Sequence, residues 1–142
     1  MKQQIETLSR LADIRGQKVR ELLNRVQYQQ TLCQRYRYNI EGLKRLCSSG
    51  GSMETSLQRD NQQRYKSTLY RMMDLQHREL ATAEQMLARI QRELQAAMRS
   101  EKIVHHVIDT KLEQWQQVLA RQEQKIQDGL ATQTWMQGRA GL

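Results

Sequence analysis

Apolar residues recur in alternating steps of three and four through the first 47 residues of the chain. Eleven of the thirteen positions in this series are apolar. The series runs Ile5, Leu8, Ala12, Arg15, Val19, Leu22, Val26, Gln29, Cys33, Tyr36, Ile40, Leu43 and Cys47. A heptad pattern sustained over about six repeats is typical of a helix in a coiled coil. Its two polar members, Arg15 and Gln29, are candidates for fixing the register of the paired helices.

The same periodicity returns after residue 68 and persists through most of the remaining chain. Its members are Leu69, Met72, Gln76, Leu80, Ala83, Leu87, Ile90, Leu94, Ala97, Glu101, Val104, Ile108, Leu112, Trp115, Leu119, Ile126 and Leu130. Two successive steps of four, from Val104 through Ile108 to Leu112, predict a stutter that locally relaxes a left-handed supercoil. The pattern fades near Gly129, and Gly138 indicates a frayed end.

A single break separates the two stretches, at LCSSGGSM, Leu46 to Met53. Paired glycines end a helix well because glycine tolerates left-handed backbone conformations. Ser52 is placed to cap a second helix, and Glu54 in its first turn would complement the helix dipole. The break has the length of a helix–helix connection and is too short for a domain linker. With no proline in the chain, the pattern predicts an all-α fold, an antiparallel two-helix coiled-coil hairpin.

The arms of this hairpin are unequal, the second helix being the longer. We expect helix 1 at about 2–47, the turn at 48–52, helix 2 at about 53–137 and a frayed tail at 138–142, all in a single coiled-coil domain spanning residues 1–142.

The second helix is longer than the first and extends beyond the end of it. If the hairpin is centred between its paired glycines, helix 1 covers only about residues 53–100. Residues 100–137 then form a lone amphipathic helix, and the apolar stripe on it is uncovered. The members of this stripe are Val104, Ile108, Leu112, Trp115 and Leu119. Because a lone helix does not leave such a stripe in water without a reason, we expect this segment to self-associate or to dock on another protein.

Charge and composition narrow the class of protein. The formal net charge is +8, which suits nucleic acid, an acidic membrane surface or an acidic protein. The excess of basic residues lies in the first 47 residues and is spread along them. No apolar stretch approaches the ~20 residues of a membrane span, and the N-terminus shows no apolar signal segment. A cytosolic protein with unpaired Cys33 and Cys47 is the default expectation.

No residues are arranged for catalysis or metal binding. The chain has no glycine-rich phosphate loop, no HExxH and no recognisable nucleophile motif. Cys33 and Cys47 fall two heptads apart in the seam, and adjacent His105 and His106 point to different faces of a helix, so nothing has chelating spacing. We therefore expect no enzymatic activity, no cofactor and no metal.

The tyrosines gather around the break. All five lie within about 22 residues of it, at Tyr28, Tyr36, Tyr38, Tyr65 and Tyr70. In a hairpin centred on the glycines, Tyr36 and Tyr65 fall level, and Tyr28 and Tyr70 nearly so. A two-helix seam is too narrow for all of them, so some are expected on the surface, where tyrosine is enriched in protein interfaces.

A short, basic, glutamine-rich hairpin with a tyrosine region before the turn and DNQQRYKSTLYRMMDLQH after it resembles the flagellar FliJ family. This family is the small component of the bacterial flagellar type III export apparatus. The resemblance covers essentially the whole chain, and its strongest local matches are NQQRYKSTL, Asn61–Leu69, and the region of Tyr36. It implies an antiparallel coiled coil similar to the central stalk of rotary ATPases.

The resemblance also implies three partners. They are the export ATPase hexamer, whose ring receives the terminal end of the stalk, the cytosolic domain of the export gate protein, and export chaperones that the protein escorts. The implied gate contacts are Leu32, Tyr36, Tyr65, Leu69 and Met72. Gln29 and Gln76 depart in residue type from the family pattern. The stripe from Val104 to Leu119 is where docking into the ring would bury apolar surface.

On this reading the protein is cytoplasmic and peripherally associated with the inner membrane at the export apparatus, with no direct membrane insertion and no nucleic acid bound. Three alternatives stay open. One is the equivalent stalk of a virulence type III injectisome. Another is an RNA-binding helical arm that uses Arg35, Arg37 and Arg45. The third is a homo-oligomeric scaffold that associates through residues 100–137.

Overall fold

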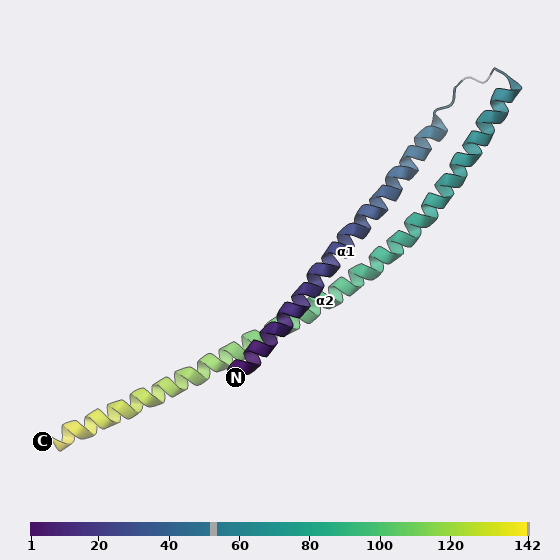
Figure 1. Ribbon diagram of the computed structural model, residues 1–142. Helices are drawn as coiled ribbons and strands as arrows, with labels where there is room; N and C mark the ends of the chain where they lie inside the picture. The colour runs from purple at the N-terminus through teal and green to yellow at the C-terminus, as the bar shows by residue number, and fades with distance from the viewer. Residues whose placement is uncertain (52–53, 142) are drawn as a thin grey trace. The chain divides into compact units, whose positions relative to one another are not determined.

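The computed structural model describes residues 1–51 and 54–141, which form two helices, α1 (Lys2–Ser48) and α2 (Ser56–Ala140). No strand occurs in these described ranges. The predicted all-α hairpin with a longer second helix is therefore confirmed (Figure 1). The helix ends differ in detail, because α2 begins three residues later than the predicted 53 and continues to Ala140.

The start of α2 is set by a reciprocal cap formed by Thr55 and Gln58. Thr55 Oγ1 accepts a hydrogen bond of 3.2 Å from the backbone N–H of Gln58. Gln58 Oε1 in return accepts from the backbone N–H groups of Glu54 and Thr55, at 3.0 and 3.3 Å. This is a capping box, which satisfies N–H groups that have no partner inside the helix. The predicted cap, Ser52, lies outside the described residues, and Glu54 precedes the helix instead of lying in its first turn.

The chain divides into two compact units, and each is described by itself. The first unit is Lys18–Ala97. Within it α1 and α2 run antiparallel (Figure 1). Apolar side chains are buried along one seam between them. Leu22, Val26 and Ile90 form one core cluster, and Leu43, Leu69 and Met73 form another. Leu22 is only 1% exposed.

Within this unit, one member of the predicted seam of α2 is wrong. Met73 is 8% exposed, whereas Met72 is 48% exposed and lies outside the seam. Regular alternation of four and three from Leu69 leads to Met73 and then to Gln76, and this keeps the stripe facing α1. The sequence did not separate the two positions because both carry methionine.

Gln29 is the one polar residue among the buried seam positions that the structure describes, at 8% exposed. Its Nε2 donates a hydrogen bond of 3.0 Å to the backbone carbonyl of Ala83. Asn39 Nδ2 donates to Gln76 Oε1 at 3.2 Å on the surface of the same unit. In each of these two pairs, the position halfway along the sequence between the bonded residues falls between residues 56 and 58. The hairpin is therefore not centred on Gly50 and Gly51, as the sequence predicted.

The shifted register leaves the first turns of α2, residues 56–66, beyond the end of α1 (Figure 1). The apolar seam of α1 ends at Cys47, and Cys47 packs against the cluster of Leu69 and Met73. Before Leu69, the corresponding seam positions of α2 are Gln62 and Lys66, which gain little from contact with an apolar helix. The end of the apolar stripe on α1 therefore lies beside the start of the stripe on α2, and this alignment sets the register.

The second unit combines Met1–Gln17 with residues 98–142, of which the structure describes all but the last. Arg15 Nη1 donates a hydrogen bond of 3.0 Å to the backbone carbonyl of Ser100. Ala12 is buried, and Val104 is only 4% exposed. The expectation that Val104 and Ile108 are uncovered is therefore wrong, because the first turns of α1 reach further along α2 than a hairpin centred on the glycines allows.

The predicted stutter is also absent from this described segment. Burial follows Val104, Ile108, Lys111 and Trp115, while Leu112 is exposed. Steps of four, three and four continue the regular heptad, and the aliphatic part of a lysine side chain covers apolar surface while its charge stays in water.

Candidate partner-binding surfaces

The five positions implied as gate contacts differ in exposure. Leu69 is buried, Leu32 and Tyr36 are half-buried, and Tyr65 and Met72 are exposed. Leu69 therefore supports the seam, while the exposed pair is available to a partner. Both members of this pair lie on the same flank of α2, seven residues apart and so two turns along one face.

The tyrosines do not form the level pairs that the sequence predicted. With the midpoint of pairing between residues 56 and 58, Tyr36 lies level with residues near 78, far from Tyr65. Tyr28 lines a groove with Met86 and Ile90 instead of facing Tyr70. Tyr28, Tyr38, Tyr65 and Tyr70 are all exposed, so the expectation of surface tyrosines near the hairpin end is correct.

A groove between α1 and α2 opens on the flank that carries Met72. Its volume is about 400 Å³, and Tyr38, Gly42 and Leu46 of α1 form the wall opposite Met72. A β-carbon added at Gly42 would have no neighbouring atom within 4 Å, so the groove is open at that point. We call this the Tyr38–Met72 groove.

Sequence reasoning missed Gly42 and Leu46 as members of this surface. A glycine inside a strongly periodic helix is a signal in itself, because it costs roughly 0.5–1 kcal/mol relative to alanine and implies a packing or functional reason. Leu46 is not a seam position of the heptad pattern, so the periodicity gives no signal for it.

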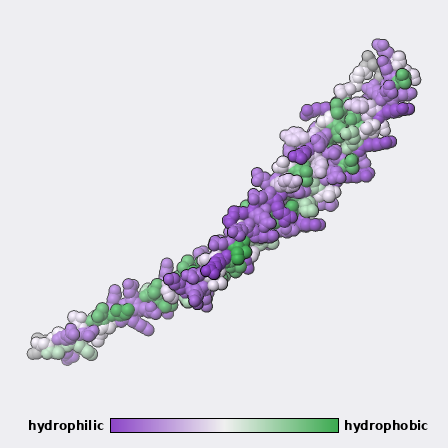
Figure 2. Space-filling model, viewed as in Figure 1, coloured by the Kyte–Doolittle hydropathy of each residue, from purple (hydrophilic) through white to green (hydrophobic). Residues whose placement is uncertain are grey.

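The end of α2 is the second candidate surface. Every described residue from 116 onward is exposed. Apolar residues nevertheless continue along one face of the end of α2, from Leu112 through Leu119 and Ile126 to Leu130. Figure 2 shows hydrophobic side chains interspersed with polar ones along this part of the chain. We call the four residues the C-terminal stripe. Trp115, a member of the predicted stripe from Val104 to Leu119, is half-buried.

Candidate metal ligands are not clustered in the part of the chain that the structure describes. Among them, no three histidine, cysteine or carboxylate side chains are grouped to hold a metal ion. Cys33 is buried and Cys47 half-buried, and both are free thiols. None of the described helical segments is long and apolar enough to span a membrane.

A family model described as flagellar FliJ protein matches residues 3–140. No curated protein matches the chain, and no solved structure matches it.

Proposed function

We propose, from the premise that this chain belongs to the flagellar FliJ family, that it acts as the central stalk of the export ATPase ring and connects this ring to the export gate. The match over nearly the whole chain confirms the resemblance seen in the sequence. Membership makes the chain a component of the flagellar type III export apparatus, in a family of non-enzymatic components. The stalk role and the partners go beyond membership and are argued from the two surfaces.

The C-terminal stripe is the observation that carries the stalk proposal. Residues 116–141 have no partner helix within the described part of the chain, yet Leu119, Ile126 and Leu130 repeat at the spacing of one helix face. Burying an apolar side chain of this size contributes about 1.5–3 kcal/mol, so the stripe favours association. A ring lumen covers a helix on all sides, which suits a segment whose whole circumference is exposed.

Because Val104 is buried, the proposed ring contact lies further toward the C-terminus than the sequence predicts. Val104 and Ile108 lie beneath or beside the first turns of α1, so they would support the docking segment from inside. The direct contacts are then Leu112, Leu119 and the later members of the stripe, with Trp115 at the boundary. The Tyr38–Met72 groove, together with Tyr65, is the proposed gate-binding surface.

Peripheral association with the inner membrane follows from the same proposal, because a stalk bound to both ring and gate is held at the export apparatus. Escort of export chaperones, which the family resemblance implies, is part of the proposal as well. The family match favours the flagellar system over an injectisome. The RNA-binding alternative is weaker because Arg37, one of its three arginines, is held by Glu84 at 3.0 Å.

Stimulation of ATP hydrolysis by the cognate export ATPase tests the stalk role. The variant Leu119→Ala/Ile126→Ala/Leu130→Ala truncates three of the four residues of the stripe and leaves the buried seam unchanged. Its matched control, Gln117→Ala/Gln124→Ala/Thr132→Ala, truncates three exposed side chains on another face of the same segment. We expect the stripe variant to need at least tenfold more protein for half-maximal stimulation, and the control to behave as wild type.

Three outcomes would contradict the proposal. The first is no stimulation by wild type at any ratio. The second is equal stimulation by the stripe variant and wild type. The third is a stable wild-type dimer in analytical ultracentrifugation that the stripe variant abolishes while stimulation persists, which would favour the scaffold alternative.

The gate contact is tested with Tyr65→Ala/Met72→Ala. This variant is expected to keep ATPase stimulation and to lose binding to the gate's cytosolic domain in calorimetry. Loss of both would argue against two separate surfaces.

A further inference from the structure

The flank of α2 opposite Tyr65 and Met72 holds a second groove that the proposed function does not use. It has a volume of about 710 Å³. Its lining includes Arg59, Gln62, Gln63, Lys66, Ser67 and Tyr70. Much of it lies on the turns of α2 that run past the end of α1. We call it the basic groove.

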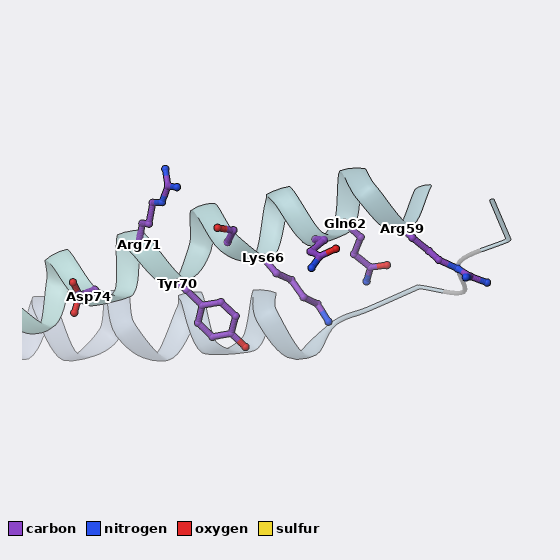
Figure 3. Close-up of a pocket in the computed structure, with 8 residues that line it drawn as sticks. Arg59, Gln62, Lys66, Tyr70, Arg71 and Asp74 are labelled. Atoms are coloured by element: carbon purple, nitrogen blue, oxygen red, sulfur yellow. The ribbon is translucent and has the colours of Figure 1, made fainter. Parts of the chain in front are cut away.

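The side chains of this groove converge on one side of α2. Figure 3 shows Arg59, Gln62, Lys66 and Tyr70 extending toward the same side, while Arg71 points away from it at the rim. Tyr70 is exposed despite its size. A β-carbon at position 50 would lie 2.9 Å from Gln62 Nε2 and 3.9 Å from Lys66 Nζ, so Gly50 lies beside the ends of these two side chains.

The charges of the groove are unbalanced. Within residues 1–51 and 54–141, no carboxylate lies within salt-bridge distance of Arg59, Lys66 or Arg71. The one carboxylate in the lining, Asp74, is held by Arg78 at 2.9 Å. The groove therefore presents positive charge that has no internal partner.

We propose that the basic groove binds an acidic peptide segment of a partner protein, at a site separate from the gate contact of the proposed function. Arg59 and Lys66, whose side chains extend into the groove, would pair with carboxylates of the segment. The Gln62 and Gln63 amides each donate and accept hydrogen bonds, as a peptide backbone requires. The Tyr70 ring offers a flat surface to one apolar or aromatic side chain.

A peptide fits these groups better than nucleic acid does. Nucleic-acid binding draws its affinity from many phosphate contacts, commonly about 6–10, whereas Arg59 and Lys66 are the two cations directed into this groove. The groove spans sixteen residues of helix from Arg59 to Asp74, a rise of about 22 Å. An extended peptide of about seven residues covers that length.

Fluorescence anisotropy with a fluorescein-labelled heptapeptide of glutamates and one central tryptophan, at physiological ionic strength, tests the proposal on the full chain. Arg59→Glu/Lys66→Glu reverses the charge of the groove. Its matched control, Arg89→Glu/Arg92→Glu, makes the same change in net charge at two exposed arginines elsewhere on α2. Gln62→Leu/Gln63→Leu tests the amides at constant charge. Circular dichroism checks that each variant is helical.

We expect wild type to bind the peptide, the groove variant to bind at least tenfold more weakly, and the control to stay within twofold. Gln62→Leu/Gln63→Leu should bind the peptide at least threefold more weakly. Attraction by net charge alone does not explain such a loss, because this variant keeps the charge of the wild type. Tyr65→Ala/Met72→Ala should leave peptide affinity unchanged, because those residues lie on the other flank. This last variant separates failure of the groove from failure of the proposed gate contact.

The proposal is overturned if wild type does not bind the peptide, or if both charge-reversal variants lose the same affinity. It is also overturned if a labelled hepta-uridylate RNA binds more tightly than the peptide and is lost in Arg59→Glu/Lys66→Glu. Loss of peptide binding in Tyr65→Ala/Met72→Ala would equally refute a separate site.

Discussion

Replacing Gln29 with leucine should make the hairpin more stable. Gln29 is buried in the seam, and its amide makes one hydrogen bond, from Nε2 to the carbonyl of Ala83 at 3.0 Å. That carbonyl lies inside α2, so it keeps its bond within the helix when the side chain is changed. The substitution therefore leaves no buried group of the partner helix without a hydrogen bond.

Two opposing terms set the size of this effect. Burying a leucine side chain contributes about 1.5–3 kcal/mol, of which the methylenes of glutamine already supply a part. The lost hydrogen bond costs about 0.5–1.5 kcal/mol. We expect the free energy of unfolding to rise by about 1 kcal/mol, which raises the Tm of a chain of this size by about 3 °C.

Urea unfolding followed by circular dichroism at 222 nm measures the change, with Gln30→Leu as control because its side chain is exposed. The control should change the free energy by less than about 0.5 kcal/mol. A fall in stability of Gln29→Leu by more than about 1 kcal/mol would refute the reasoning, because the hydrogen bond would then outweigh the burial. Light scattering on the same sample shows whether the amide also limits the oligomeric state, as a polar seam residue does in other coiled coils.

Three further substitutions test other parts of the fold. Leu22→Ala should lower the free energy of unfolding by about 2–5 kcal/mol, because Leu22 is fully buried. Leu23→Ala, at an exposed position, should change it far less, and thermal unfolding of the two variants measures the difference. Gly42→Ala should raise stability by about 0.5–1 kcal/mol and weaken binding of the gate domain in calorimetry, because the methyl group enters the Tyr38–Met72 groove; higher affinity would contradict this. Thr55→Ala should cost about 1 kcal/mol and speed amide hydrogen exchange at the start of α2, while Thr55→Ser should preserve the cap.

The existence of two long helices followed from the sequence because their heptad pattern is long and uninterrupted by proline. The register of the hairpin did not follow from the paired glycines. It was nevertheless readable from the ends of the apolar stripes, since Cys47 is the last seam residue of α1 and Leu69 the first apolar one of α2. Apolar burial contributes more than the geometry of a connection that tolerates several lengths.

The candidate surfaces were harder to predict because they depend on this register. Val104 was expected on the surface and is buried, whereas Tyr65 was expected opposite Tyr36 and lies far from that level. The grooves combine residues of α1 and α2 or follow one flank of a helix, and single-residue patterns do not distinguish the two flanks. Only the general expectation of exposed tyrosines near the hairpin end was independent of register.

The register also determines the chemistry of the two uncovered parts of α2. Pairing from Leu69 onward leaves residues 56–66 free of α1 at one end and residues 116–141 free at the other. The first part carries Gln62 and Lys66 at its seam positions, which water solvates well, so it stays uncovered without cost until an oppositely charged partner arrives. The second part carries Leu119 and its equivalents, which gain from being covered. One helix thus presents an electrostatic surface before its paired region and an apolar one after it. Because salt weakens only the first kind of contact, raising the ionic strength should release the acidic peptide while ring stimulation persists.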